Sequence, residues 1–66
     1  MTFTEAMNYA NGGYKVRRDN WGLKYVWVSD QDRVFLTEGG EKGKEGLYNP
    51  SIADINCPDW RLKGKG

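Results

Sequence analysis

Hydrophobic and polar positions follow two different periods along the chain, and each period predicts a different element. Near the start, the apolar side chains Phe3, Ala6, Met7 and Ala10 recur every three or four positions. This spacing gathers them on one face of an α-helix. From Tyr14 the pattern changes to strict alternation of apolar and basic residues, which is typical of a strand with one buried face. The chain is therefore expected to open with an amphipathic helix followed by a strand.

Both ends of this helix carry local signals. Thr2 and Glu5 have the spacing of a capping box, in which each side chain accepts a hydrogen bond from the other residue's backbone N–H. Gly12 and Gly13 follow the last apolar position, and glycine adopts the left-handed conformation of a helix C-terminus without a steric penalty. The helix is thus predicted to begin after residue 2 and to end at this glycine pair.

The next apolar segments predict a hairpin. Residues 23–28 and 33–37 are rich in β-branched and aromatic side chains, and residues 29–32 between them have turn composition. In the first strand, Tyr25 and Trp27 face the side opposite to the valines that alternate with them. Only one of these faces can pack against the helix, so the other is expected to be partly exposed, covered by a second chain, or used to hold a ligand.

The second half of the chain has weaker patterns. Residues 38–46 contain four glycines and no side chain suited to a core, so we expect a solvated loop. Leu47 and Tyr48 form either a brief strand or the anchor of that loop. Ser51 and Asp54 have the spacing of a second cap, on a single helical turn. Residues 57–62 are the expected last strand.

These elements define the expected fold class and the domain. We predict an α+β fold with an N-terminal helix packed on an antiparallel sheet of three to four strands, and a short helical turn before the last strand. Residues 1–62 are expected to form a single domain, and residues 63–66 a flexible tail.

Chain length limits how far such a domain stabilises itself. A chain of 66 residues buries only about 60% of the surface that its unfolded form exposes. Disulfides, metals or association usually compensate. Cys57 is the one cysteine and there is no histidine, so one chain has neither an intramolecular disulfide nor a Cys and His zinc site. We therefore expect no metal and a homo-oligomer, a dimer or tetramer, in which copies share a ligand site.

Net charge and hydropathy argue against two classes of binding partner, duplex nucleic acid and membranes. Ten Lys and Arg against nine Asp and Glu leave a net charge of +1, which argues against general binding to duplex nucleic acid. No apolar run approaches the roughly 20 residues that cross a bilayer, and the capped first helix differs from a signal peptide. We expect a cytoplasmic protein with no membrane partner, which agrees with an unpaired thiol.

Catalysis has little support in the sequence. Without histidine, the Ser-His and Cys-His arrangements of nucleophilic enzymes are excluded. Cys57 lies before Pro58 among apolar neighbours and is expected to be an inert small core residue, not a reactive thiol. Asp30 and Asp32 belong to a hairpin tip. We therefore expect no enzymatic activity and no cofactor.

Aromatic side chains are the feature that points to binding. The chain has three Trp, four Tyr and two Phe, more rings than a core of this size hides, and a buried indole also needs a partner for its N–H. Exposed rings stack on nucleobases and nearby cations neutralise phosphate. The interleaved cations are Lys15, Arg17, Arg18, Lys24 and Arg61. The competing interpretation is that the indoles are core and dimer contacts and that these cations form an ordinary solvated surface.

The opening residues 1–6, the Arg18-to-Trp21 spacing after a basic strand, and the closing Asp54-Ile55 and Asp59-Trp60 pairs give the chain a family resemblance. It resembles the small phage family that includes the second Thoeris anti-defense protein, some members of which are described as anti-CRISPR proteins. About half of the residues carry this resemblance.

The resemblance implies a phage-encoded oligomer, acting in the host cytoplasm, that sequesters a cyclic ADP-ribose isomer or cyclic oligonucleotide messenger without cleaving it. By position, it implies that rings contact adenine or ribose, that Arg17 or Arg18 meets phosphate, and that Asn20 or Asp59 hydrogen-bonds a ribose hydroxyl. The implied rings are Phe3, Trp21 and Trp60.

Two alternatives remain open at this stage. The chain could inhibit a host defence complex, such as a CRISPR effector, by docking on it with the sheet face around Tyr25 and Trp27. It could also be an accessory domain without a ligand, although this leaves the surplus of rings unexplained.

Overall fold

Two helices and five strands make up the fold in a computed structural model that describes residues 1–39 and 43–65. The helices are α1 and α2, and the strands are β1 to β5 in chain order. Their bounds are α1 Phe3–Asn11, β1 Tyr14–Arg18, β2 Tyr25–Val28, β3 Val34–Thr37, β4 Glu45–Leu47, α2 Ile52–Asn56 and β5 Trp60–Lys65.

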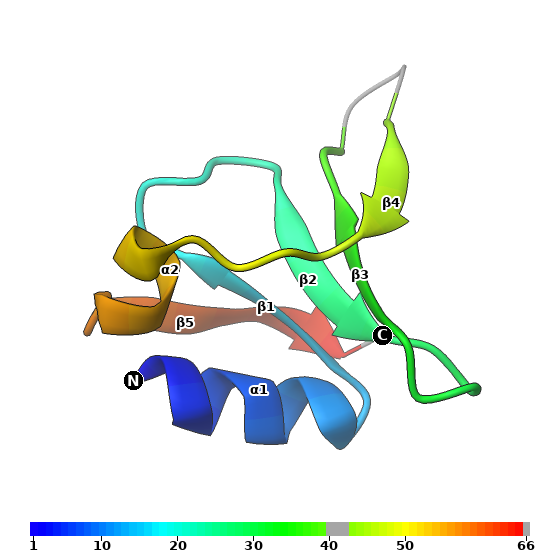
Figure 1. Ribbon diagram of the computed structural model, residues 1–66, viewed down its shortest axis with the longest axis horizontal. Helices are drawn as coiled ribbons and strands as arrows, with labels where there is room; N and C mark the ends of the chain where they lie inside the picture. The colour runs from blue at the N-terminus through cyan, green and yellow to red at the C-terminus, as the bar shows by residue number, and fades with distance from the viewer. Residues whose placement is uncertain (40–42, 66) are drawn as a thin grey trace.

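The strands form one antiparallel sheet with the order β4-β3-β2-β1-β5. Both helices lie on the same side of this sheet, with α1 beneath β1 and β5, and α2 near the start of β5 (Figure 1). We call this side the inner face and the opposite side the outer face. The α+β class and the order of helix, hairpin, helical turn and last strand are confirmed.

The sheet is larger than the three to four strands predicted. The additional strand, β4, lies within and just after the segment expected to be a loop, and it pairs Glu45 with Thr37 and Leu47 with Phe35. This segment has little strand propensity of its own, so the exposed edge of β3 supplies the reason for its extended conformation. Part of the predicted loop, residues 40–42, lies outside the described residues.

The last strand also runs further than its sequence suggests. β5 pairs with β1 from Arg18↔Trp60 to Tyr14↔Lys65, and the register shifts between Lys15 and Val16. Residues 63–65 of the predicted flexible tail, residues 63–66, are therefore part of β5 and are held by backbone pairing to β1, while residue 66 lies outside the described residues.

The two predicted capping boxes are present, one at the start of each helix. The Thr2 hydroxyl accepts from the Glu5 N–H at 3.2 Å, and the Glu5 carboxylate accepts from the Thr2 N–H at 2.9 Å. This backbone hydrogen bond lowers the pKa of Glu5. At the other end of α1, Gly13 has φ +98°, a conformation that a side chain would strain. Ser51 and Asp54 form the same box at α2.

The core is small and centres on one indole. Its fully buried apolar members come from α1 and from three neighbouring strands, and Trp60 is by far the largest of them. They are Ala6, Ala10, Val16, Val26 and Trp60. The alanines allow α1 to approach the sheet closely, so the expected apolar face of the helix does pack inward.

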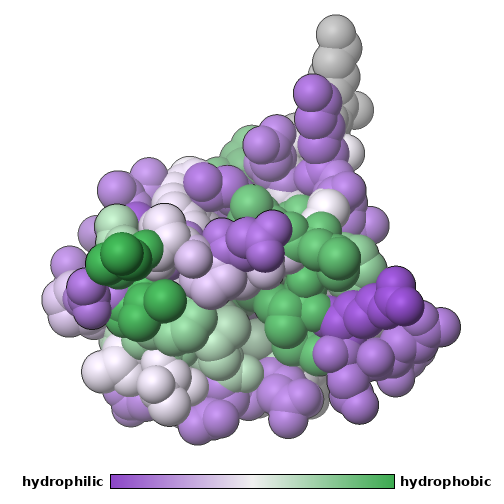
Figure 2. Space-filling view, viewed as in Figure 1, coloured by the Kyte–Doolittle hydropathy of each residue, from purple (hydrophilic) through white to green (hydrophobic). Residues whose placement is uncertain are grey.

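Apolar surface remains exposed on the inner side of the molecule. Figure 2 shows it over α2 and between α1 and the β3–β4 side of the sheet. Ile52 and Ile55 on α2 are 78% and 48% exposed, while Val34 and Leu36 are only half-buried because α1 does not extend over them. Apolar side chains of α2 and of β3 thus remain in contact with solvent on this side of the described chain.

The hairpin between β2 and β3 yields a stability prediction. Asp32 has φ +59°, in the left-handed region that favours glycine. Asp32→Gly is expected to raise the free energy of unfolding by about 0.5–1 kcal/mol, and thermal unfolding should show a melting temperature higher by a few degrees. Asp30→Gly is the matched control. Asp30 has no positive φ, so this variant should not raise the free energy of unfolding. A lower melting temperature for Asp32→Gly would contradict the prediction.

Candidate functional site

Three rings implied as ligand contacts meet on the inner face, where β1 ends and β5 begins. Phe3 packs edge-on against Trp60 with ring centroids 5.6 Å apart, and Trp21 does so at 5.1 Å. Tyr48 joins the group with its ring centroid 6.3 Å from that of Trp21. We call Phe3, Trp21, Tyr48 and Trp60 the ring cluster.

Trp60 is the buried base of the ring cluster. Only 2% of it is exposed, and its indole N–H donates to the Asp54 carbonyl at 2.9 Å. Its surroundings, Phe3 included, satisfy and cover it within a single protomer. In this arrangement Trp60 supports the neighbouring rings and presents no free surface of its own.

Trp21 is partly buried, as Phe3 and Tyr48 are, and lies in the loop between β1 and β2. Its backbone N–H donates to the Arg18 carbonyl at 3.1 Å, and its own carbonyl accepts from the Lys24 N–H at 3.4 Å. This tight loop places the Lys24 ammonium 4.5 Å from the centroid of the Trp21 ring. Asn20 is exposed next to it in sequence. A flat ring, a cation and an amide therefore share one loop.

A charged network lies behind the ring cluster. The buried Asp54 carboxylate accepts from Arg18 Nη1 at 3.0 Å, from the Tyr48 hydroxyl at 2.9 Å and from the Ser51 N–H at 3.2 Å. Burial alone would raise the pKa of Asp54, but these hydrogen bonds outweigh it and hold the pKa below its ordinary value. Burial, followed by the hydrogen bond to Asp54, raises the pKa of Tyr48. At neutral pH Asp54 and Arg18 therefore form an ion pair, and the neutral Tyr48 hydroxyl, which donates to Asp54, is held beside Trp21.

The two arginines implied as phosphate ligands lie on opposite faces, since neighbouring residues of a strand alternate. Arg18 points to the inner face and is paired with Asp54. Arg17 points to the outer face, and its Nη1 donates to the carbonyls of Arg18 and Asp19 at 3.2 and 3.1 Å. The structure therefore brings only Arg18 to the ring cluster.

Asp59 lies on the surface at the same end of the sheet. Its carbonyl accepts from the Asp19 N–H at 3.0 Å, and the Asp19 carboxylate pairs with Arg61 at 2.8 Å. A hollow of about 370 Å³ lies here, lined by Met1, Asp19, Pro58, Asp59, Trp60 and Arg61. Asp59 is thus close to Trp60 along the chain but on a separate, polar surface.

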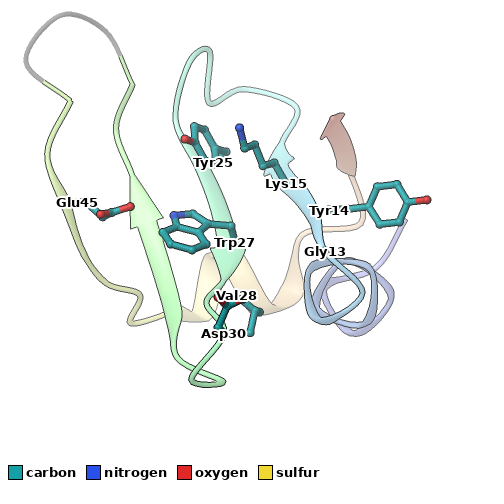
Figure 3. Close-up of a pocket in the computed structure, with 8 residues that line it drawn as sticks. All are labelled: Gly13, Tyr14, Lys15, Tyr25, Trp27, Val28, Asp30 and Glu45. Atoms are coloured by element: carbon teal, nitrogen blue, oxygen red, sulfur yellow. The ribbon is translucent and has the colours of Figure 1, made fainter. Parts of the chain in front are cut away.

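Tyr25 and Trp27, expected at an interface, lie side by side on the outer face (Figure 3). The indole N–H of Trp27 donates to the Thr37 hydroxyl at 3.0 Å, and that hydroxyl is 3.1 Å from Glu45 Oε1. The rings of Trp27 and Phe35 are stacked with centroids 5.2 Å apart. A hollow of about 390 Å³ lies over this region. Lys15 reaches toward Tyr25, as Figure 3 also shows.

Two partners of Trp21 had no clear sequence signal as site residues. Tyr48 follows the glycine-rich segment, where the pattern suggests only an anchor, and it reaches the cluster because Asp54 holds its hydroxyl. Lys24 was one cation among several, and only the turn at Trp21 reveals its position over that ring.

Neither a metal centre nor a membrane-spanning segment emerges from the described part of the chain. Within residues 1–39 and 43–65, no three Cys, Asp or Glu side chains gather as metal ligands. No helix in the same ranges is long and apolar enough to cross a bilayer.

The fold and the ring cluster define a small α+β domain in which three partly buried rings surround one buried indole. The sequence matches the model of the Thoeris anti-defense 2-like domain over residues 1–63. The chain therefore belongs to this family, as its resemblance indicated, and membership supports a phage anti-defense role. No curated protein and no solved structure matches the chain.

Proposed function

We propose that the chain counters host immunity by binding a nucleotide-derived cyclic messenger, a cyclic ADP-ribose isomer or a cyclic oligonucleotide, and holding it without cleavage. The observation that carries this proposal is the partly exposed Trp21 ring with the Lys24 ammonium 4.5 Å from its centroid. A base stacks on such a ring, and the adjoining cation meets its phosphate.

The surroundings of Trp21 support tight binding because they are already in place. Trp60 and Tyr48 pack edge-on against it, and Tyr48 is itself fixed by Asp54. A ring that is held before the ligand arrives loses little side-chain freedom on binding. Asn20 is the candidate for hydrogen bonding to a ribose hydroxyl.

The charged groups near the cluster support sequestration over catalysis. General acid and base catalysis works best with a pKa near the operating pH. The pKa of Asp54 is lowered and that of Tyr48 is raised, both away from neutrality, and Arg18 is engaged by Asp54. We therefore propose a stoichiometric binder, not an enzyme.

We further propose that a second copy completes the site. One indole face and one ammonium leave most of a messenger uncovered. Ile52 and Ile55 expose apolar surface on α2, the helix that carries the Asp54 partner of Tyr48. Association through this surface would cover α2 and place a second chain near the ring cluster.

Capture and heat release test the proposal. The protein is incubated with cyclic ADP-ribose isomers or cyclic dinucleotides, free ligand is measured after filtration, and the protein is then heat-denatured. We expect depletion of one of these ligands, its intact return on heating, and a higher melting temperature in its presence, since a ligand of the native state stabilises that state.

Two other outcomes would overturn the proposal. Cleaved ligand after heating would indicate an enzyme. No binding across the panel, together with recovery of a defence protein from host lysate by wild-type protein but not by a Trp27→Ala variant, would favour docking through the outer face.

A further inference from the structure

We propose that the outer face of the sheet binds single-stranded nucleic acid, with bases stacked on Tyr25 and Trp27 and phosphates held by cations of β1 and β5. This surface lies across the sheet from Trp21, so the inference goes beyond the messenger site and stands independently of it. Within the described residues, both helices lie on the inner face and leave this one uncovered (Figure 1).

The rings of the outer face form a platform along β2. Tyr25 and Trp27 are two residues apart on one strand and therefore about 7 Å apart along it, which gives two successive unstacked bases a ring each. Phe35 is the register partner of Trp27 on β3, and its ring stacks beside that of Trp27 on the same face at an angle of 24°. The Thr37 hydroxyl accepts the Trp27 N–H. Trp27 is thus held in place while it lines the hollow.

Basic side chains of β1 and β5 lie beside the platform, on the side of β2 that pairs with β1. Strand alternation and the pairing of Arg17 with Arg61 place these two side chains on the outer face. Lys63 reaches the same face because the register shift leaves it between the pairs Lys15↔Gly64 and Val16↔Leu62. The Lys15 and Lys63 ammonium groups lie 5.1 and 5.3 Å from the centroid of the Tyr25 ring.

These two lysines are well placed to exchange partners. A cation over a ring near the surface gains only weakly from that contact, whereas phosphate offers a full negative charge. When a base stacks on Tyr25, Lys15 and Lys63 can move from the ring to the flanking phosphates. The acidic groups nearby are at the margins: Asp19 pairs with Arg61, Glu45 lies by the Thr37 hydroxyl on the β4 side, and Asp30 lines the far end of the hollow.

The flat rings of this platform favour a single-stranded ligand over a duplex. Bases stack on side chains only when they are free of their own helix, so this platform fits a single strand and not a duplex. With two or three phosphates contacted, the logarithm of the binding constant should fall with the logarithm of salt concentration with a slope of about −1.4 to −2.1. We therefore expect short, salt-sensitive binding with little sequence preference.

Fluorescence anisotropy with labelled oligo(dT) and oligo(U), and with a duplex of equal length, tests the inference at several salt concentrations. We expect both single strands to bind and the duplex to bind far more weakly. Trp27→Ala should weaken binding roughly 5- to 150-fold. The double variant Lys15→Gln, Lys63→Gln should make the salt slope shallower by about 1.4, and it removes no ring from the sheet.

The control variants separate this site from the messenger site. Trp21→Ala and Lys44→Gln should leave oligonucleotide binding unchanged, and far-ultraviolet circular dichroism should show every variant folded. Equal binding of duplex and single strand, an unchanged affinity for both outer-face variants, or cross-linking that places Trp27 between two copies of the chain would each overturn the inference. Failure here leaves messenger capture unaffected, because that readout depends on Trp21.

Discussion

Replacing Trp21 with alanine is expected to weaken capture of the cyclic messenger strongly while the protein stays folded. Stacking of a base on one ring contributes about 1–3 kcal/mol, so the affinity should fall roughly 5- to 150-fold. Isothermal titration calorimetry with the ligand found by the capture assay gives the dissociation constant directly. The loss should be specific, because the core indole Trp60 remains covered by Phe3.

Two further variants isolate the cause of this loss. Trp21→Phe keeps a flat ring and should retain most of the affinity, whereas Lys24→Gln should reduce affinity mainly at low salt, where a phosphate contact counts most. Tyr9→Ala is the matched control, since Tyr9 is a half-exposed ring on α1. If Tyr9→Ala and Trp21→Ala weaken capture equally, or if neither does, the messenger site is not at Trp21.

Replacing Asp54 is expected to cause the largest loss of stability. Asp54→Ala removes the acceptor of Arg18, Tyr48 and the Ser51 N–H together, and it leaves a cation without its partner. Removing one member of a buried ion pair costs about 3 kcal/mol or more. For a domain of this size that lowers the melting temperature by roughly 12–24 °C. Differential scanning calorimetry measures the shift.

The same carboxylate predicts a pH dependence with a defined sign. Because the folded-state pKa of Asp54 lies below its unfolded value, the folded protein holds this proton less readily than the unfolded chain. Its contribution to stability is therefore complete above the ordinary carboxyl value, about pH 4, and is lost as the pH falls through the folded pKa. Asp54→Asn should flatten this acid limb of the melting curve. An unchanged acid limb in Asp54→Asn would show that another group causes it.

The parts of the fold that depend on local sequence were predictable. The Thr2 and Ser51 capping boxes and the apolar face of α1 are set by residues within a few positions of one another, and the structure has them as expected. β4 and the last residues of β5 are different. Their glycine- and lysine-rich sequences have little preference for a strand, and they become strands because β3 and β1 offer them backbone partners.

The sequence predicted which residues form the candidate site, but it did not predict their burial or their hydrogen-bond partners. Family resemblance implied Phe3, Trp21 and Trp60 as one set of ligand contacts, but it did not indicate that Trp60 would be fully buried while Trp21 stays partly exposed. That difference depends on the Asp54 carbonyl, which satisfies the Trp60 indole from another element. Alternation placed Arg17 and Arg18 on opposite faces, but only the position of α2 decides which of them meets a carboxylate.

The position of Trp60 on an outermost strand has a consequence for biosynthesis. Strands at the rim of a sheet are commonly dispensable, yet β5 brings in the largest core side chain and joins β1, which is made long before it. While residues 60–65 are still inside the ribosome, Val16 and Val26 are covered by α1 alone and lack the Trp60 indole that completes the core. Frameshifts or nonsense mutations just ahead of residue 60 would thus remove the largest core side chain and the partner strand of β1 together, and the shortened chain would expose apolar surface that favours aggregation.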